Sequence, residues 1–432
     1  MRRLHRAVRL AAGGLAACAA PAWAQTETRT SADASVTAGY SNNPFAVLGD
    51  DTGSAVVTVD LAPRIDLLTA RSTLSLSGDV NLQQYLRRYG RNDSYSGAID
   101  YRLQSSERVT SHLRLDASDA VLGSFNGYQP IVAGTSPIGA LVGASSGAAV
   151  AGGAGAGGTT TLLPIIPVTA LTSFTDIGLY GLRNRRVLGR LSGDVGVSLS
   201  ARDSLTLGGY GEVTRYQNLR AGDYEAYGAS AGYSRRVSDQ FSVGLRGTAS
   251  DYHYRPPQGD TRAYSVEATG TGRISDVWTV DGAVGVSFID GGGIGSTRST
   301  SLSGNLNLCR RGPLSTFCVQ AARQVSPTGL EGSQYVTSAG FTWAKRLDGR
   351  SNVSLGGSYS RVGGDRARLI AGALPLQTEY AQATAGYDRR LAERLRFVAS
   401  TSYRQLLGQS EAGRPKDFGG QVGLSYRLGD RR

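Results

Sequence analysis

The amino-acid sequence predicts an all-β fold, a transmembrane antiparallel up-and-down β-barrel of about 18 strands (16–18). Three observations predict it. Apolar and polar residues alternate with a period of two along most of the chain, the alternating stretches are long, and the connections between them alternate in length. Successive side chains of a strand point to opposite faces, so each stretch has one apolar and one polar face. A tilted strand needs roughly 9–11 residues to cross a bilayer, and these stretches are long enough.

The stretch from Val277 to Phe288 shows the pattern most clearly. Its apolar or small set includes Trp278, Val284 and Phe288, and small or polar residues such as Asp281 lie between them. The two aromatic residues at the ends of the apolar set occupy the positions of an interfacial girdle. This stretch is therefore interpreted as one strand of a membrane-spanning barrel.

Residues 1–24 are predicted to be an export signal, with a basic start, an apolar core from Leu10 to Ala20 and an Ala22-Trp23-Ala24 cleavage site. An alternative is a lipobox at residues 15–18, which would leave Cys18 acylated. Removing the four arginines of the signal from 46 basic residues leaves 42, against 34 acidic ones. This mild and scattered positive charge does not indicate nucleic-acid binding.

The mature chain, 25–432, is predicted to be one barrel without separate domains. The alternating stretches are expected at 32–40, 57–67, 74–83, 94–103, 109–118, 186–199, 204–216, 224–234, 241–250, 262–274, 277–289, 299–310, 316–325, 335–345, 351–361, 379–389, 395–405 and 417–428. Two of the strand ends repeat one another, YSRRVSDQFSV from Tyr233 and YDRRLAERLRF from Tyr387.

The connections after even-numbered strands are predicted to be short, such as 200–203, and those after odd-numbered strands longer, such as 251–260 and 362–378. Short periplasmic turns and longer outer loops are typical of outer-membrane barrels, and an even strand count returns both termini to the periplasm. The longest connection is the Gly/Ala-rich third outer loop, 119–174. It is expected either to fold into the pore, as the third loop of general porins does, or to remain on the surface.

The polar face of each strand must line the lumen, because an Arg or Lys facing the bilayer centre costs about 2–4 kcal/mol in such barrels. The charged residues predicted to line the lumen are Arg102, Arg114, Arg190, Arg246, Arg273, Arg396, Arg404, Asp79, Asp100, Asp116, Asp194, Glu212, Glu267, Asp281 and Asp388. The two signs are balanced in this set, so it predicts no strong ion selectivity. The alternative is that these charges form internal ion pairs that only solvate a wide barrel.

A disulfide is predicted between Cys309 and Cys318, which flank the turn 312–315 at directly opposed positions on the inward face. The exported compartment is oxidising, and opposed Cα atoms of a non-hydrogen-bonded pair lie about 4.5 Å apart, at the short edge of the disulfide range.

Catalysis has little support, and the protein is predicted not to be an enzyme. His112 is expected opposite Asp100, an arrangement that can orient a base, but a satisfied lumen pair is the favoured interpretation. GAGAGG at 153–158 has no βαβ unit around it and is low complexity. The sequence shows no metal-ligand cluster, no phosphate loop and no cofactor motif.

Several stretches resemble the outer-membrane β-barrel porins of proteobacteria that often accompany exopolysaccharide gene clusters. They are GYSNNPF (39–45), LCRRGPLSTFC (308–318) and AARQVSPTGLEG (321–332). The resemblance implies a channel in the outer membrane, with lipid, polysaccharide and periplasmic export components as partners. The expected function is export of exopolysaccharide or diffusion of hydrophilic solutes. Tyr85, Tyr210 and Tyr216 are expected to point inward and stack on sugars, or to act as interfacial anchors. The alternative is a structural or adhesive barrel with a plugged lumen.

Overall fold

A computed structural model describes residues 27–47, 52–124, 176, 179, 183–256, 258–293, 298–329, 332–363, 379–407 and 415–429. The predicted signal, Cys18 and most of the predicted third loop lie outside the described residues. The strands are β1 (Glu27–Ser41), β2 (Ser54–Leu68), β3 (Ser72–Tyr85), β4 (Arg91–Gln104), β5 (Val109–Val121), β6 (Arg185–Ser198), β7 (Asp203–Tyr216), β8 (Tyr224–Arg236), β9 (Phe241–Tyr254), β10 (Gln258–Arg273), β11 (Trp278–Gly293), β12 (Arg298–Arg311), β13 (Ser315–Thr328), β14 (Gly332–Arg346), β15 (Ser351–Gly363), β16 (Glu379–Arg390), β17 (Leu395–Leu407) and β18 (Lys416–Leu428).

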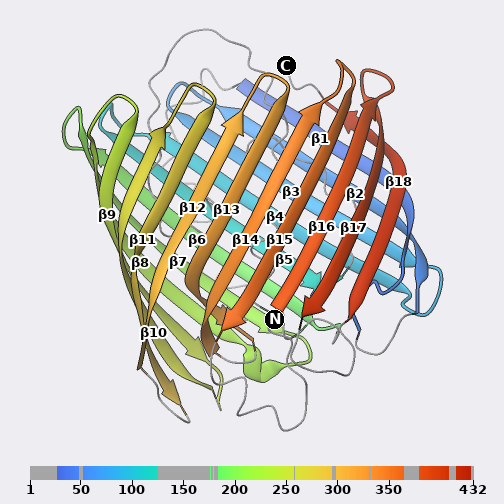
Figure 1. The fold of residues 1–432 in the computed structure, drawn as a ribbon, viewed down its shortest axis with the longest axis horizontal. Coiled ribbons are helices and arrows are strands. Elements are labelled where there is room, and N and C mark those ends of the chain that lie inside the picture. Colours follow the sequence, from blue (N-terminus) through green and yellow to red (C-terminus); the bar gives the residue numbers. More distant parts are fainter. Residues whose placement is uncertain are drawn as a thin grey trace.

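The strands form one closed sheet in which each strand pairs antiparallel with its sequence neighbours. Closure joins β1 to β18, in a register that runs from Ala32 opposite Leu428 to Ser41 opposite Gly419 (Figure 1). Closure removes the two free edges that an open sheet would have, a condition for crossing a membrane with strands. The predicted 18-strand antiparallel barrel is therefore confirmed. One short 3-10 helix, η4 (Arg220–Gly222), lies between β7 and β8, and no described helix is both long and apolar enough to cross a bilayer.

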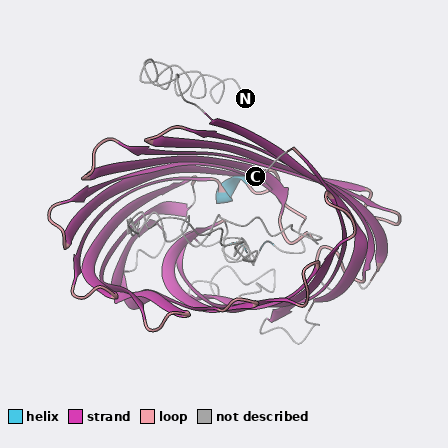
Figure 2. Ribbon diagram, turned by 90° about the horizontal axis from the view of Figure 1, so that it is seen from above, coloured by secondary structure: helices cyan, strands magenta, loops and turns pink. Residues whose placement is uncertain are grey.

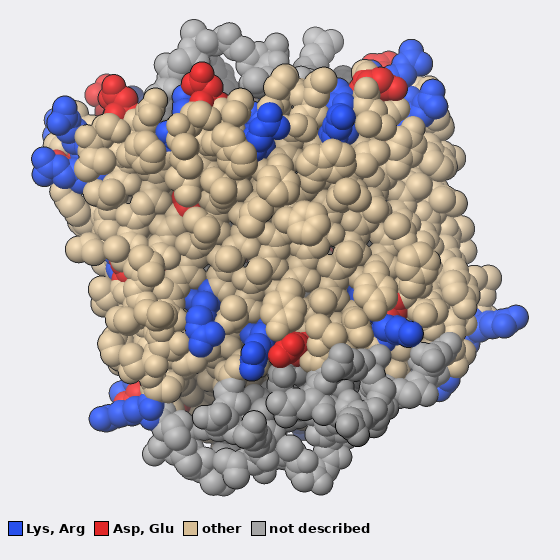
Figure 3. Space-filling model, in the orientation of Figure 1, with Lys and Arg blue, Asp and Glu red and all other residues tan. Residues whose placement is uncertain are grey.

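The polarity of the two faces of the sheet is inverted relative to that of a water-soluble protein, because apolar side chains face outward and polar side chains face inward. On β1, Ser35 and Thr37 are buried, whereas Val36 and Tyr40 are more than half exposed. Val284 and Leu302, on the outward faces of β11 and β12, are 65% and 69% exposed. The space-filling view shows a broad, nearly uncharged belt across the middle of the face in view, with most Lys, Arg, Asp and Glu toward its two ends (Figure 3). This is the architecture of a bacterial outer-membrane barrel.

Exposed aromatic side chains lie on the outward face toward both ends of the wall. Tyr233, Phe241 and Tyr426 lie near the short turns, and Tyr40 and Phe418 lie near the opposite end. Such girdles mark the two interfaces of a bilayer. The end with short turns and both chain ends of the barrel is the periplasmic end, and the other is the outer end.

The connections confirm the predicted short turns after even-numbered strands, for example 199–202 and 391–394. Two connections predicted to be long are short. β9 and β10 extend through most of 251–260 and leave only 255–257 between them, and β13 and β14 leave only 329–331. The alternation continues through the first of these segments, with Tyr252 and Tyr254 buried and His253 exposed, so β9 extends beyond the bound predicted for it.

Candidate functional site

The candidate functional site is the lumen, and the structure places every predicted lumen residue on the inward-facing positions of its strand. The inward positions are identified by their alternation with exposed apolar residues, such as Glu212 against Leu207 on β7 and Arg246 against Leu245 on β9. The period of two in the sequence is the signal that located them.

On β3 and β7, burial of the inward side chains rises from the periplasmic end toward the outer end. On β7, Ser204, Thr206 and Tyr210 are half-buried, whereas Thr214 and Tyr216 are buried. On β3, inward positions 75–79 are half-buried or exposed, and 81, 83 and 85 are buried. Beside these two strands the lumen is open to solvent toward the periplasm and filled toward the outside. Near the periplasmic end of β12 to β14 and β17, by contrast, the inward side chains of Cys309, Cys318, Ala344 and Val398 are buried.

Most lumen arginines form ion pairs. Arg114 Nη2 lies 2.7 Å from Asp116 Oδ1, Arg190 lies 3.7 Å from Glu212, and Arg246 contacts Glu267. Several inward ion-pair partners were absent from the predicted set, although all of them except Asp176 lie within the bounds predicted for their strands. They include Asp33 with Arg427, Arg64 with Asp66, Asp176 with Arg186, and Asp417 with Arg404. The predicted interior ion-pair arrangement is thus present over much of the wall.

The predicted register at His112 is wrong by two residues. His112 lies directly opposite Arg102, and Asp100 lies opposite Arg114, because the hairpin closes on a mutual hydrogen-bonded pair between Ser106 and Val109. His112 still reaches Asp100 diagonally, with Nε2 2.9 Å from Oδ2, and its Nδ1 lies 3.2 Å from Asp194 Oδ1. Both ring nitrogens are therefore engaged by carboxylates of the wall, which leaves neither to act as a base on a solute.

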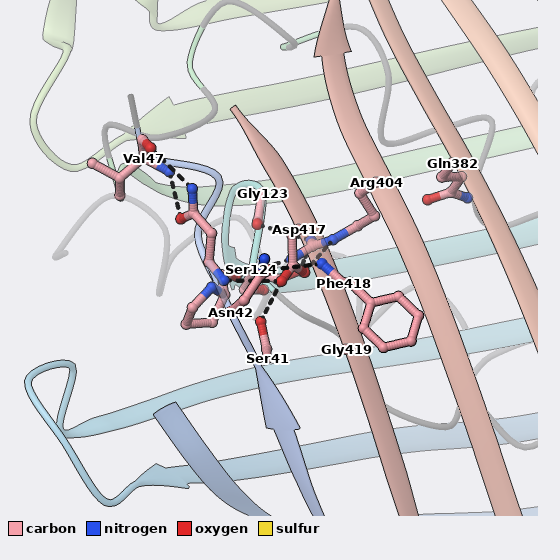
Figure 4. A network of polar contacts seen from close by, with 12 residues as sticks. Ser41, Asn42, Val47, Gly123, Ser124, Gln382, Arg404, Asp417, Phe418 and Gly419 are labelled. Carbon is pink, nitrogen blue, oxygen red and sulfur yellow. Dashed lines mark hydrogen bonds and ion pairs between the residues drawn. The ribbon is translucent and has the colours of Figure 1, made fainter. Parts of the chain in front are cut away.

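Arg404 and Asp417 join the barrel wall to two outer connections (Figure 4). Their side chains on β17 and β18 are 2.6 Å apart and are 9% and 0% exposed. Arg404 also donates to the carbonyl oxygens of Pro44, Gly123 and Ser124, at 3.0–3.1 Å. The Asp417 carboxylate accepts from the Ser41 hydroxyl and the Asn43 backbone N–H. One inward ion pair thus fixes the start of the first loop and the start of the third loop inside the lumen.

The far end of the third loop is also anchored inside the barrel. Asp176 is 3% exposed, and its carboxylate accepts hydrogen bonds from Tyr216 Oη at 2.8 Å, Gly329 N at 2.9 Å and Arg186 Nη1 at 2.9 Å. Leu179 is 1% exposed and belongs to an apolar cluster with tyrosines of β7 to β9. The boundaries predicted for this loop, 119–174, were too early, because β5 continues to Val121 and β6 begins at Arg185. The segment 125–175, which the sequence predicts either to enter the pore or to remain on the surface, lies outside the described residues.

The β13–β14 hairpin reaches across to the β7–β9 part of the wall. A Cβ built on Gly222, in η4, would lie 2.3 Å from Gly329 O at the hairpin tip, so the two backbones touch. Tyr254 Oη on β9 lies 3.3 Å from Ser333 Oγ on β14. The end view shows a flattened barrel with part of the sheet curving into its interior (Figure 2). The hairpin thus narrows the outer half of the lumen.

The inward tyrosines of the outer half are packed against other side chains and do not line an open surface. Tyr85 packs against Phe45 and Tyr89, with ring centroids 5.5 and 5.7 Å away, and is 2% exposed. Tyr216 is 3% exposed. The expectation that these two residues stack on sugars or anchor the interface is therefore wrong, because they are buried inside the barrel. Tyr210 is half-buried beneath the Arg190 guanidinium, 4.9 Å from its ring centroid.

The sulfur atoms of Cys309 and Cys318 are bonded in the structure. The two residues lie directly opposite each other on β12 and β13, with Cα atoms 4.1 Å apart. Both side chains are buried on the inward face near the periplasmic end.

No family model and no curated protein matches the chain. Solved structures that are similar include Pseudomonas aeruginosa OccK2 in complex with glucuronate (12% identity, covering 93% of this chain and 98% of that chain, TM-score 0.43) and Pseudomonas aeruginosa OprD (10%, 95% and 99%, TM-score 0.41). The siderophore receptor PirA of Acinetobacter baumannii is similar at 9% identity, covering 94% of this chain and 81% of that chain, with a TM-score of 0.41. At these values the likeness carries no argument about substrate or mechanism.

Proposed function

We propose that the protein is a passive channel that lets small hydrophilic solutes cross the outer membrane. The observation that carries the proposal is the difference between the periplasmic and outer halves of the lumen. Its wall is polar and charged, open to water beside β3 and β7 over the periplasmic half, and narrowed at the outer half by two loops and the β13–β14 hairpin. A barrel of this strand number is too wide for side chains alone to fill, so inserted segments determine the size of the passage.

The narrowing of the outer half favours small solutes over an exopolysaccharide chain as the transported species. A polymer in transit needs an unobstructed path along the whole lumen, whereas Leu179, Tyr216 and Tyr254 are buried in a continuous cluster at the outer level. Export of exopolysaccharide and contact with periplasmic export components therefore remain expectations from the sequence resemblance alone.

The proposal is tested with the purified mature protein in planar lipid bilayers and in liposomes. We expect discrete, voltage-independent current steps, and swelling of liposomes in monosaccharide solutions that weakens as the sugar grows from one to several units. A membrane that stays silent, with liposomes that do not swell, would contradict the channel.

The second candidate function is a structural barrel with a plugged lumen. The specific observation that favours it is the same buried cluster, which joins Leu122, just after β5, to residues of β7 to β10 and β14 to β17 across the outer half. Silence in the bilayer experiment, with the protein fully folded, is the outcome that this alternative predicts.

A further inference from the structure

Four even-numbered strands end in a pair of consecutive basic residues at the periplasmic end. The pairs are Arg235-Arg236 on β8, Arg310-Arg311 on β12, Lys345-Arg346 on β14 and Arg389-Arg390 on β16. Because neighbouring residues of a strand face opposite sides, each pair sends one cation toward the lumen and the other toward lipid headgroups. The alternation with buried inward residues of the same strands, such as Cys309 and Ala344, identifies the inward members.

The inward members form part of an arc of arginines around the periplasmic mouth. Arg273 on β10 and Arg396 on β17 face inward at the same end, so the periplasmic arginine arc consists of Arg236, Arg273, Arg311, Arg346, Arg390 and Arg396. Within the part of the chain that the structure describes, none of them lies within ion-pair distance of an acid, unlike the arginines deeper in the lumen. All are exposed or half-buried.

Arg390 and Arg396 lie directly opposite each other across the β16–β17 ladder. Like charges at directly opposed positions destabilise a sheet. Arg390 Nη2 donates to Gly349 O at 3.1 Å. The inward acid nearest in sequence, Asp388, accepts a hydrogen bond from Asn352 and attracts Arg396 from beyond ion-pair distance. Asp281 faces inward on β11, two residues from Thr279, which lies opposite Arg273. Asp239, Asp276, Asp348 and Glu393 lie in the turns, where Asp348 accepts hydrogen bonds from the backbone of its own turn. A mobile anion at the mouth would relieve the repulsion between the two arginines.

We propose that the periplasmic arginine arc makes the channel selective for small anionic solutes, with carboxylates and phosphates as the chemical class. This inference rests on the proposed channel function. A mouth lined by one sign of charge, with low-dielectric walls, raises the local concentration of the opposite ion. The arginine guanidinium also matches carboxylate and phosphate geometry through paired hydrogen bonds. The balanced count of lumen charges included Arg273 and Arg396 but not the other four members of the arc, which lie just beyond the predicted strand bounds, and it therefore predicted no selectivity.

The test compares two sets of variants of the mature protein in planar bilayers under a potassium chloride gradient. One set replaces the inward members, R236Q, R311Q, R346Q and R390Q. The matched control replaces their outward neighbours on the same strands, R235Q, R310Q, K345Q and R389Q, and so removes the same charge at the same depth. A heat-shift gel confirms that each variant is folded.

The unmodified channel is expected to show a reversal potential of the sign that marks chloride preference. The preference should shrink as salt rises above 0.1 M, where the Debye length is about 10 Å. The inward set should lose the preference and the outward set should keep it. Current steps without chloride preference in the unmodified protein would overturn the inference alone, as would equal loss in both sets. Absence of steps would overturn the proposed channel and the inference with it. If the inward set does not fold, the unmodified protein and the single R390Q variant decide the question.

Discussion

Gly304 and Arg323 are the last opposed residues at which β12 and β13 share a hydrogen-bonded ladder. Beyond them, Arg298–Ser303 pairs only with β11, and Gln324–Thr328 pairs only with β14. Arg323 and Tyr335 hold the separated segments together through side chains, since Arg323 Nε donates to Ser301 Oγ at 3.2 Å and Tyr335 Oη donates to Ser287 O at 3.1 Å. The separation lets the β13–β14 hairpin leave the wall and enter the lumen.

Cysteines at Ser299 and Thr328 should remain unlinked in the folded protein. The two positions would be directly opposed if the ladder continued in the register of Cys309 and Cys318, but Thr328 lies in the inserted hairpin. The check is a peptide map of the S299C/T328C variant after mild oxidation. The native cysteine pair, on the same two strands in the same register, is the internal control. A 299–328 crosslink in most molecules would show that the hairpin belongs to the wall.

The position of this hairpin is a feature that the sequence could not predict. Strand number and the inward or outward direction of residues such as Val284 and Arg246 follow from a period of two, which is a local property. Contact between Gly329 and Gly222, or between Asp176 and Tyr216, joins segments far apart in the chain, and no local pattern encodes it. The position of His112 is an intermediate case. The period of two correctly predicts that its side chain faces inward. Which residue lies opposite depends on the geometry of the turn, which the alternation does not contain.

Replacing Arg404 with Met should destabilise the barrel by about 3–5 kcal/mol, because it leaves the Asp417 carboxylate buried without its partner. It also frees the carbonyl oxygens of Gly123 and Ser124. Urea unfolding in detergent micelles measures the change in free energy. The control is R102M, since Arg102 is 69% exposed and pairs with Asp100 at the lumen surface, where an ion pair contributes about 0–1 kcal/mol. Equal losses in the two variants would contradict the anchoring role of Arg404.

Removing the disulfide should cost about 2–3 kcal/mol, the loop-closure value for a short loop, and should leave the barrel closed. Cys309 and Cys318 are nine residues apart, and β12 and β13 remain paired on both sides through their other neighbours. The C309S/C318S variant is compared with the unmodified protein by urea unfolding. Peptide maps of the unmodified protein that are identical with and without reductant would refute the bond itself.

Val284 and Ala283 are neighbours on β11 whose side chains face lipid and the lumen. An arginine placed at one position should therefore affect folding differently from an arginine placed at the other. Val284 is 65% exposed on the outward face, in the middle of the strand, so V284R should cost about 2–4 kcal/mol, the cost of an arginine facing the bilayer midplane. A283R places the same side chain on the inward, half-buried face, where water and carboxylates such as Asp281 solvate it. The folded fraction after refolding into lipid vesicles, read from the heat-shift on a gel, should fall for V284R and stay near that of the unmodified protein for A283R. The opposite order would show that the polar face of this strand meets hydrocarbon, and a barrel with that arrangement could not enclose the aqueous passage that the channel needs.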